Sequence, residues 1–113
     1  MAKSNKPIFW SLFAAGGTLA AFLAPVLVLL FLLAALGHAP DILSYASLHA
    51  LATHWLGKLA LLGVITLFLW HAAHRLRVTL HDFGLRQDAV VAVVVYSAAA
   101  LGTGLTVLYL LRL

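Results

Sequence analysis

Hydrophobic residues along this chain are gathered into three long runs, and polar residues are confined to the ends and to the two segments between the runs. The runs cover residues 8–36, 55–74 and 89–111. Each run is long enough to cross a bilayer as a helix, which takes about 20 mostly apolar residues. The pattern therefore predicts an all-α membrane protein with three transmembrane helices in a single domain, residues 1–113.

The first run is distinguished by its length and by an internal proline. No Asp, Glu, Lys or Arg occurs between Pro7 and Pro40, whereas the apolar region of a signal peptide has only about 7–15 residues. We therefore expect an uncleaved spanning helix that tilts, or begins in the interface, because it exceeds one hydrocarbon thickness. Ser4 or Asn5 is suited to cap its start, and Pro25 predicts a kink within it.

Basic residues are distributed unevenly between the two sides of these runs. The segment between the first two runs carries no Lys or Arg, and the next segment carries three. Cytoplasmic segments carry the excess of Lys and Arg, so we expect a cytoplasmic N-terminus and a periplasmic C-terminus. Five basic residues then lie inside (Lys3, Lys6, Arg75, Arg77 and Arg86) and two outside (Lys58 and Arg112).

The composition fits a membrane protein and excludes several classes of function. Of 113 residues, 65% are hydrophobic and 9% charged, against about 25% charged in an ordinary soluble domain. The absence of cysteine excludes a disulfide scaffold, thiolate ligation of an iron–sulfur cluster and a cysteine nucleophile. The net charge of +4 comes from residues that flank apolar runs, so nucleic-acid binding is not indicated. No metal site is expected, because His38, His49 and His54 are scattered and only the isolated Asp41 accompanies them.

Small residues lie along one side of two of the expected helices. In lipid there is no hydrophobic drive for helices to associate, and small residues at this spacing let two helices approach closely. The pattern indicates packing between helices or between subunits, although Ala and Gly are common in any membrane helix. The residues are Gly17, Ala21 and Ala24 in the first run, and Ala98, Gly102 and Thr106 in the third.

Ionisable residues are concentrated at the end of the second run, between Trp70 and Asp82. Charge near a bilayer is expensive unless it is paired, hydrated or functional, so we expect any chemistry of this chain here. His71 and His74 are three residues apart and share a helix face, and Arg75 lies beside that face.

Three further polar residues follow His74 and Arg75. His81 and Asp82 are interpreted as a charge-supported pair in the loop that follows the second run. Arg77 fits an interfacial residue whose long side chain reaches toward water and fixes the orientation of the helix.

One interpretation of this cluster is a quinone site. A quinone needs hydrogen-bond donors at its carbonyl groups, a proton route to water, and aromatic or apolar walls. Imidazole titrates near neutral pH, so it can donate a hydrogen bond and relay a proton, and Arg is a permanent donor. Trp10 and Phe13, expected on the same membrane side, would supply a wall and an indole N–H.

Two other interpretations of the cluster stay open. Ligation of a b-type haem normally takes imidazoles from two facing helices. The first and third runs contain no His, so a partner chain would have to supply the second ligand. Alternatively, His74 and Arg75 only extend into the interface and fix orientation, and the three Trp residues belong to the aromatic belts found near span ends.

Short motifs spread along the chain follow the order and spacing of a known family. They are KPIFWSLFAAGG from Lys6 to Gly17, Ala24-Pro25-Val26, Leu43-Ser44-Tyr45, Gly57-Lys58, Leu69-Trp70, His74-Arg75 and His81-Asp82. In these motifs the chain resembles the D subunit of bacterial quinol:fumarate reductase, the small hydrophobic membrane anchor of that complex. The resemblance covers nearly the whole chain up to the third run, which is similar only in character.

The resemblance implies a four-subunit complex of anaerobic respiration in the bacterial cytoplasmic (inner) membrane. A flavoprotein with FAD reduces fumarate in the cytoplasm, and an iron–sulfur subunit passes it electrons. Two three-helix anchors, this chain and a C-type partner, hold both to the bilayer and form the menaquinol-oxidising site. The family's anchors in this branch carry no haem. This chain is therefore expected to be a non-catalytic membrane-anchor domain with no redox centre of its own.

By this resemblance, the quinone-binding residues are Trp10, Phe13, His74 and Arg75. We expect quinol protons to leave toward the cytoplasm through His74 or a water molecule, with His71, His81 and Asp82 as candidates for proton relay or support of the site. His71 departs from the family pattern, which has no histidine there, and its role is left unassigned. Arg77 and the short Gln87-Asp88 link also depart from that pattern.

Two alternatives of other classes stay open at this point. One is a haem-b anchor of a succinate dehydrogenase, which a visible spectrum of the complex would reveal. The other is a small structural or transport membrane protein, which would purify alone or with copies of itself.

Overall fold

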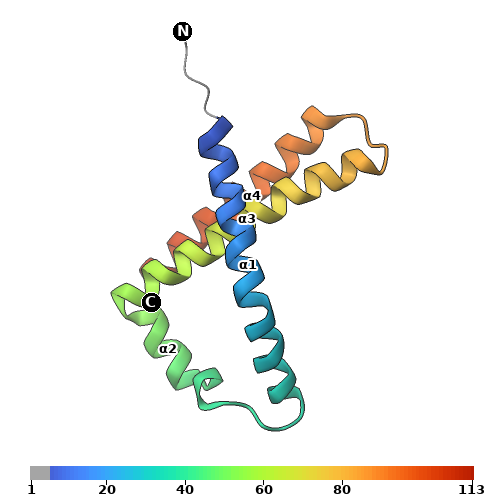
Figure 1. Ribbon diagram of the computed structural model, residues 1–113. Helices are drawn as coiled ribbons and strands as arrows, with labels where there is room; N and C mark the ends of the chain where they lie inside the picture. Colours follow the sequence, from blue (N-terminus) through green and yellow to red (C-terminus); the bar gives the residue numbers. More distant parts are fainter. Residues whose placement is uncertain (1–5) are drawn as a thin grey trace.

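The computed structural model describes residues 6–113, and in this part of the chain three long helices are joined by short connections (Figure 1). Helix α1 covers Lys6–Ala35, α3 covers Trp55–Asp82 and α4 covers Asp88–Arg112. All three are long and apolar enough to cross a membrane, which confirms the predicted all-α architecture. The expected cap at Ser4 or Asn5 lies outside the described residues.

The segment between α1 and α3 is folded and not an open loop. It contains a short 3-10 helix η1 (Asp41–Leu43) and the helix α2 (Tyr45–Thr53). Ser44 caps α2, since its side chain accepts a hydrogen bond from the backbone N–H of Ser47. The connection therefore returns the chain from α1 to the start of α3 through two short helices.

Helix α3 continues past residue 74, where the sequence predicts its end. The polar stretch from Arg75 to Asp82, expected as loop, is helical. The helix ends at Asp82, and Gly84, two residues further on, has a φ of 92°, which glycine adopts without strain. There the N–H of Gly84 reaches the carbonyl of His81 and the N–H of Leu85 reaches that of Leu80, which is a Schellman cap. Hydropathy thus marks the edge of the apolar segment, and the glycine marks the end of the helix.

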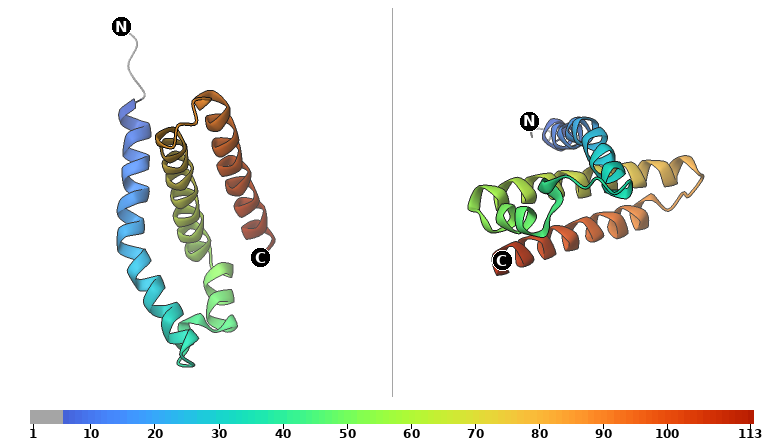
Figure 2. Two further views of the ribbon diagram at one scale, coloured as in Figure 1. Left: turned by 90° about the vertical axis from the view of Figure 1, so that its right-hand side faces the viewer. Right: turned by 90° about the horizontal axis from the view of Figure 1, so that it is seen from below.

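Helix α3 lies between the other two long helices (Figure 2). Helix α4 runs back beside it as a hairpin, and α1 crosses its other side at a wide angle (Figure 1). Helix α1 is unbroken at Pro25 and changes direction in its C-terminal half (Figure 2), which stands apart from α3. The predicted kink is present as this change of direction.

The buried hydrophobic core of the described residues is small and lies between α3 and α4. Ala73 of α3 packs with Val91, Val95 and Ala99 of α4. Many large apolar side chains are exposed on the isolated chain, for example Phe22 at 74% and Phe31 at 64%. A soluble monomer rarely exposes so much contiguous apolar surface, so lipid or other membrane helices must cover these faces.

Two adjacent glycines permit the close crossing of α1 and α3. A Cβ on Gly16 would lie 2.7 Å from the carbonyl oxygen of Leu67 and 2.9 Å from Cβ of His71. A Cβ on Gly17 would lie 2.9 Å from Cε1 of His71. Since real Cβ atoms do not approach so closely, larger residues here would force the helices apart.

The predicted small-residue faces are used only in part. Gly17 lies at the α1–α3 crossing, and a Cβ on Gly102 would lie 2.9 Å from Cδ1 of Leu69, at the α3–α4 contact. Ala21, Ala24 and Ala98 are exposed. Of the predicted small residues, Gly17 and Gly102 make the close approaches among the residues that the structure describes.

Candidate functional site

The candidate site lies where α1 begins, α3 ends and α4 begins, at one end of the molecule (Figure 2). Successive long helices run in opposite directions, so these three helix ends lie on the same side, although the wide crossing of α1 keeps its start apart from the α3–α4 turn (Figure 1). The sequence-predicted residues from the first run and from the end of the second therefore share a side, as expected from topology.

Phe13 of α1 contacts two histidines of α3. Its ring stacks on His71, with centroids 4.5 Å apart and planes 17° apart. It meets His74 edge-on, with centroids 4.6 Å apart and planes 63° apart. Offset stacking and edge-to-face contacts are the favoured geometries of aromatic pairs. The structure thus brings together two of the four predicted quinone-binding residues, Phe13 and His74.

His71 of α3 forms a hydrogen bond from its side chain to the backbone of α1. Its Nδ1 lies 3.0 Å from the carbonyl oxygen of Phe13. A carbonyl only accepts, so Nδ1 donates and carries the proton in the neutral ring. The missing side chains of Gly16 and Gly17 leave room for the imidazole to reach this backbone oxygen. The residue left unassigned by the sequence therefore sets the position of Phe13.

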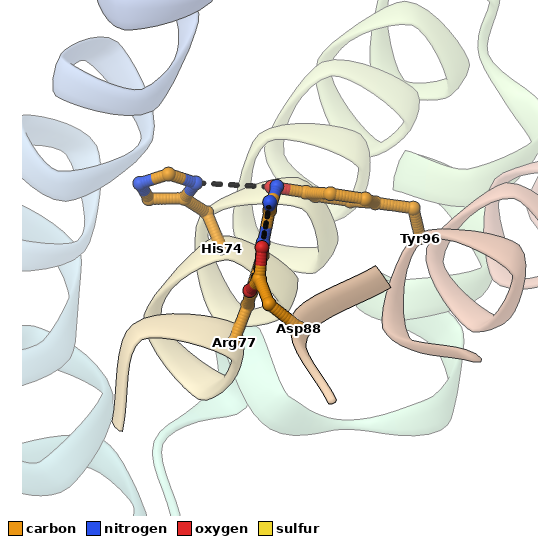
Figure 3. A network of polar contacts seen from close by, with 4 residues as sticks. All are labelled: His74, Arg77, Asp88 and Tyr96. Carbon is orange, nitrogen blue, oxygen red and sulfur yellow. Dashed lines mark hydrogen bonds and ion pairs between the residues drawn. The ribbon is translucent and has the colours of Figure 1, made fainter. Parts of the chain in front are cut away.

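His74 begins a polar network that links α3 to α4 (Figure 3). Its Nδ1 lies 3.0 Å from the hydroxyl of Tyr96. Arg77 Nη1 lies 3.4 Å from the same hydroxyl. Arg77 also forms a two-pronged ion pair with Asp88, with Nε 2.9 Å from Oδ1 and Nη2 2.5 Å from Oδ2. This paired geometry is the strongest form of an arginine–carboxylate contact.

Tyr96 and Asp88 are site residues that the sequence pattern did not single out. Their spacing held a usable signal, because Asp88 and Tyr96 are eight residues apart and so lie near one face of α4. From the sequence, Arg77 is interpreted only as an orienting interfacial residue. The structure corrects that interpretation, since its guanidinium is paired and lies 5.7 Å from the Tyr96 ring centre.

Trp70 stabilises the same α3–α4 contact. Its indole N–H donates to the hydroxyl of Thr103 at 3.2 Å, and its ring stacks on Tyr96 with centroids 5.9 Å apart. The Thr103 hydroxyl in turn donates to the carbonyl of Ala99 at 2.8 Å. Trp70 therefore holds the ring of Tyr96 in addition to lying near the end of the apolar run.

Trp10 and Arg75 are placed differently from Phe13 and His74. The Trp10 side chain is 70% exposed, and that of Arg75 is also exposed. Neither makes a side-chain hydrogen bond or ion pair within the part of the chain that the structure describes. Of the two aromatic residues expected beside the cluster, Phe13 contacts the histidines of α3. The side chains of Trp10 and Arg75 are instead available to groups outside this chain.

His81 and Asp82 do not form the predicted pair. Both are exposed in the last turn of α3. The ion pair found among residues 6–113 joins Arg77 to Asp88, and a helix directs adjacent side chains about 100° apart. Neither side chain takes part in the hydrogen bonds or the ion pair found at the site among the described residues.

The site combines hydrogen-bonding side chains with an aromatic ring. Helix α3 offers the second nitrogen of His74 and the guanidinium of Arg75, and α1 adds the ring of Phe13. Helices α1 and α4 contain no histidine, so a haem beside α3 would need a ligand from another chain. Among the described residues, no group of three or more His, Asp or Glu is placed to hold a metal ion.

Comparison with known proteins gives similarity along nearly the whole chain. The family of fumarate reductase D subunits matches residues 1–111. The fumarate reductase D subunit of Aliivibrio fischeri is 36% identical over 110 residues, which cover 96% of this chain and 92% of that protein. That of Vibrio parahaemolyticus is 37% identical, with 96% and 88% covered. That of Mycobacterium bovis is 45% identical over 107 residues, with 89% and 82% covered.

Proposed function

Since this chain belongs to the family of fumarate reductase D subunits, we propose that it helps to build the site at which that complex oxidises menaquinol. The chain is a membrane-anchor subunit of fumarate reductase with three helices able to cross a bilayer. Beyond that, we assign to it the quinol-facing residues Trp10, Phe13, His74 and Arg75.

The contact of Phe13 with His74, next to the exposed Arg75, carries this proposal. The aromatic ring forms a wall, while imidazole and guanidinium provide hydrogen-bond donors on the adjacent face of α3. A quinone headgroup is a flat ring with two carbonyl oxygens, so it needs this combination of apolar surface and directed donors. The exposed indole of Trp10, one turn before Phe13 in α1, extends the wall toward the end of the helix.

The reaction at this site is a separation of electrons from protons. Oxidation of one quinol releases two electrons and two protons. The iron–sulfur subunit would take up the electrons and its partner flavoprotein, holding FAD, would supply them to fumarate, which takes up two electrons and two protons to give succinate. The protons of the quinol leave toward the cytoplasm through His74 or a water molecule. This chain positions donors and keeps water out of the electron path, and it performs no chemistry on fumarate.

The proposed assembly places this chain beside a C-type three-helix anchor in the cytoplasmic membrane of the bacterium. The excess of Lys and Arg on one side supports a cytoplasmic N-terminus and a cytoplasmic α3–α4 turn. The iron–sulfur and flavoprotein subunits would then cover the end of the molecule at which His74 and Arg75 lie.

A pair of arginine substitutions tests the proposal. In the assembled complex, Arg75→Leu should lower quinol oxidation at least about tenfold, because a charged hydrogen-bond donor is lost. Fumarate reduction with a soluble artificial electron donor should be unchanged. Arg86→Leu removes the same charge from the nearby turn and should leave both activities intact. Parallel loss of both activities in Arg75→Leu would instead assign Arg75 to assembly.

Purification and spectroscopy test the partners and cofactors. A tagged copy of this chain should retain a flavoprotein and an iron–sulfur protein through purification from membranes. The purified complex should lack the Soret absorption of stoichiometric haem. Isolation of the chain alone or with copies of itself would contradict the proposed assembly, and a stoichiometric Soret band would contradict the haem-free anchor.

A further inference from the structure

The polar network that ends at His74 has a fixed direction of hydrogen-bond donation (Figure 3). The Asp88 carboxylate only accepts, and the Arg77 guanidinium only donates. Nε and Nη2 of Arg77 donate to the Asp88 carboxylate, and Nη1 lies 3.4 Å from the hydroxyl oxygen of Tyr96. The oxygen of Tyr96 is therefore on the accepting side of its contact with Arg77.

The hydrogen of the Tyr96 hydroxyl must then point away from Arg77. An N–H of Arg77 already faces the phenol oxygen, and the positive charge of the guanidinium repels the hydrogen end of the O–H dipole. On the other side of the oxygen, His74 Nδ1 lies 3.0 Å away. The hydroxyl is directed at this nitrogen, so Tyr96 donates and Nδ1 accepts.

An imidazole that accepts at Nδ1 carries its proton on Nε2 when neutral. We propose that Tyr96, oriented by Arg77 and Asp88, is a positioning residue that holds His74 as the Nε2–H tautomer and so presents an N–H donor to the quinone. In Figure 3 the second ring nitrogen of His74 points away from Tyr96, and the ring also contacts Phe13 of α1. The inference rests on the proposed function and specifies what His74 does in it.

The tautomer has a chemical consequence for the quinol protons. Nε2–H donates to a quinone oxygen but has no lone pair with which to accept a proton. His74 therefore binds and polarises the ring oxygen, and the first proton of the quinol leaves by the water route. His71 provides an internal contrast, because its Nδ1 donates to the Phe13 carbonyl. Two histidines three residues apart are thus expected to hold opposite tautomers.

Nitrogen NMR of the complex with ¹⁵N-labelled histidine tests the tautomer directly. Protonated and unprotonated ring nitrogens have well-separated resonances, and signals that disappear in His74→Gln and in His71→Gln identify the two rings. We expect an unprotonated, hydrogen-bonded Nδ1 and a protonated Nε2 for His74, with the reverse for His71. A neutral His74 that is protonated at Nδ1 would overturn the inference.

Two tyrosine substitutions test the role of Tyr96. In Tyr96→Phe the ring and its stacking on Trp70 remain but the donor is lost. We expect the His74 Nδ1 resonance to move to the position of a nitrogen without a hydrogen bond, and kcat/KM for quinol to fall about two- to tenfold. Tyr109→Phe removes a hydroxyl from an exposed residue of the same helix and should change neither quantity. Fumarate reduction with a soluble donor should stay constant in both and shows that the complex is assembled.

The two measurements separate the inference from the proposed function. An unchanged His74 spectrum in Tyr96→Phe would overturn the positioning role of Tyr96, whatever the kinetics. If the spectrum changes as expected and quinol oxidation does not, the tautomer is supported and the quinone-binding role of His74 is contradicted. Both changes together support the tautomer and its function.

Discussion

The carbonyl oxygen of Phe13 and Nδ1 of His71 are 3.0 Å apart, and the rings of the same two residues stack with centroids 4.5 Å apart. This double contact joins α1 to the middle of α3. Because the ring of Phe13 also touches His74, the contact with His71 fixes an aromatic wall beside His74, about two turns before the end of α3. The position of Phe13 in the proposed quinone site thus depends on His71, which is not one of the four quinone-binding residues.

Substitution of His71 by Phe should weaken the joint between α1 and α3. The aromatic ring and its stacking are retained, but the hydrogen bond to the Phe13 carbonyl is lost, which should destabilise this packing by about 0.5–1.5 kcal/mol. Thermal denaturation of the purified complex, followed by release of this chain, measures the effect. His38→Phe changes an exposed histidine of the connecting segment and should leave the midpoint unchanged. An equal shift in both variants would contradict the role of His71.

Substitution of Gly16 by Ala should force α1 away from α3. The added Cβ would lie 2.7 Å from a backbone oxygen of Leu67, which cannot rotate aside as a side chain does. Such overpacking costs about 1–3 kcal/mol, so we expect less complex in the membrane and a lower thermal midpoint. Gly63→Ala is the matched control, because a Cβ there meets nothing within 4 Å. Equal tolerance of both alanines would show that the helices do not cross at Gly16.

The architecture could be predicted from hydropathy because each long apolar run must form a helix in lipid. The end of α3 could not, since the polar residues from Arg75 to Asp82 leave the apolar run without leaving the helix. Gly84 is the local signal for the true end. Helix ends are set by capping, and a hydropathy pattern contains no information about capping.

From the sequence, the site could be predicted only for residues that are close together on one helix. His71, His74 and Arg75 can be identified together because they are close in sequence. Tyr96 belongs to another helix, and its contact with His74 depends on how α3 and α4 pack and on their relative rotation. For the same reason the sequence favours Asp82 as a paired carboxylate, although Asp88, across the turn, makes the pair with Arg77.

Exchange of the charges in the Arg77–Asp88 pair should restore the thermal stability that either single substitution removes. Arg77→Asp places two carboxylates together, and Asp88→Arg places two guanidinium groups together, so each single variant should lower the thermal midpoint. The double variant rebuilds an ion pair between α3 and α4 and keeps the charge of this end of the molecule constant. Recovery of the midpoint, and its loss with added salt, would identify the pair. A double variant as unstable as the worse single variant would contradict it.

Trp10→Ala should raise KM for quinol without altering stability. The indole is 70% exposed in this chain, so its removal leaves no cavity within the subunit, while a wall of the proposed site is lost. Steady-state quinol oxidation by the complex, with fumarate reduction from a soluble donor as reference, measures the effect. Trp55→Ala removes a similarly exposed indole at the start of α3 and is the control. Unchanged quinol kinetics in Trp10→Ala would contradict a role in quinone binding and leave Trp10 as a residue of the aromatic belt at the membrane interface.

The orientation of the chain predicts which of two single cysteines can be reached from outside the cell. The natural chain has no cysteine, so Ala39→Cys and Gln87→Cys each introduce a unique thiol at an exposed position at opposite ends of the helices. The excess of Lys and Arg near Gln87 favours a cytoplasmic location for the α3–α4 turn. A maleimide that cannot cross the inner membrane should therefore modify Ala39→Cys in intact cells, and Gln87→Cys only after that membrane is opened. Complete modification of both after denaturation controls for burial by partner subunits, and the reverse pattern would place His74 and Arg75 on the periplasmic side.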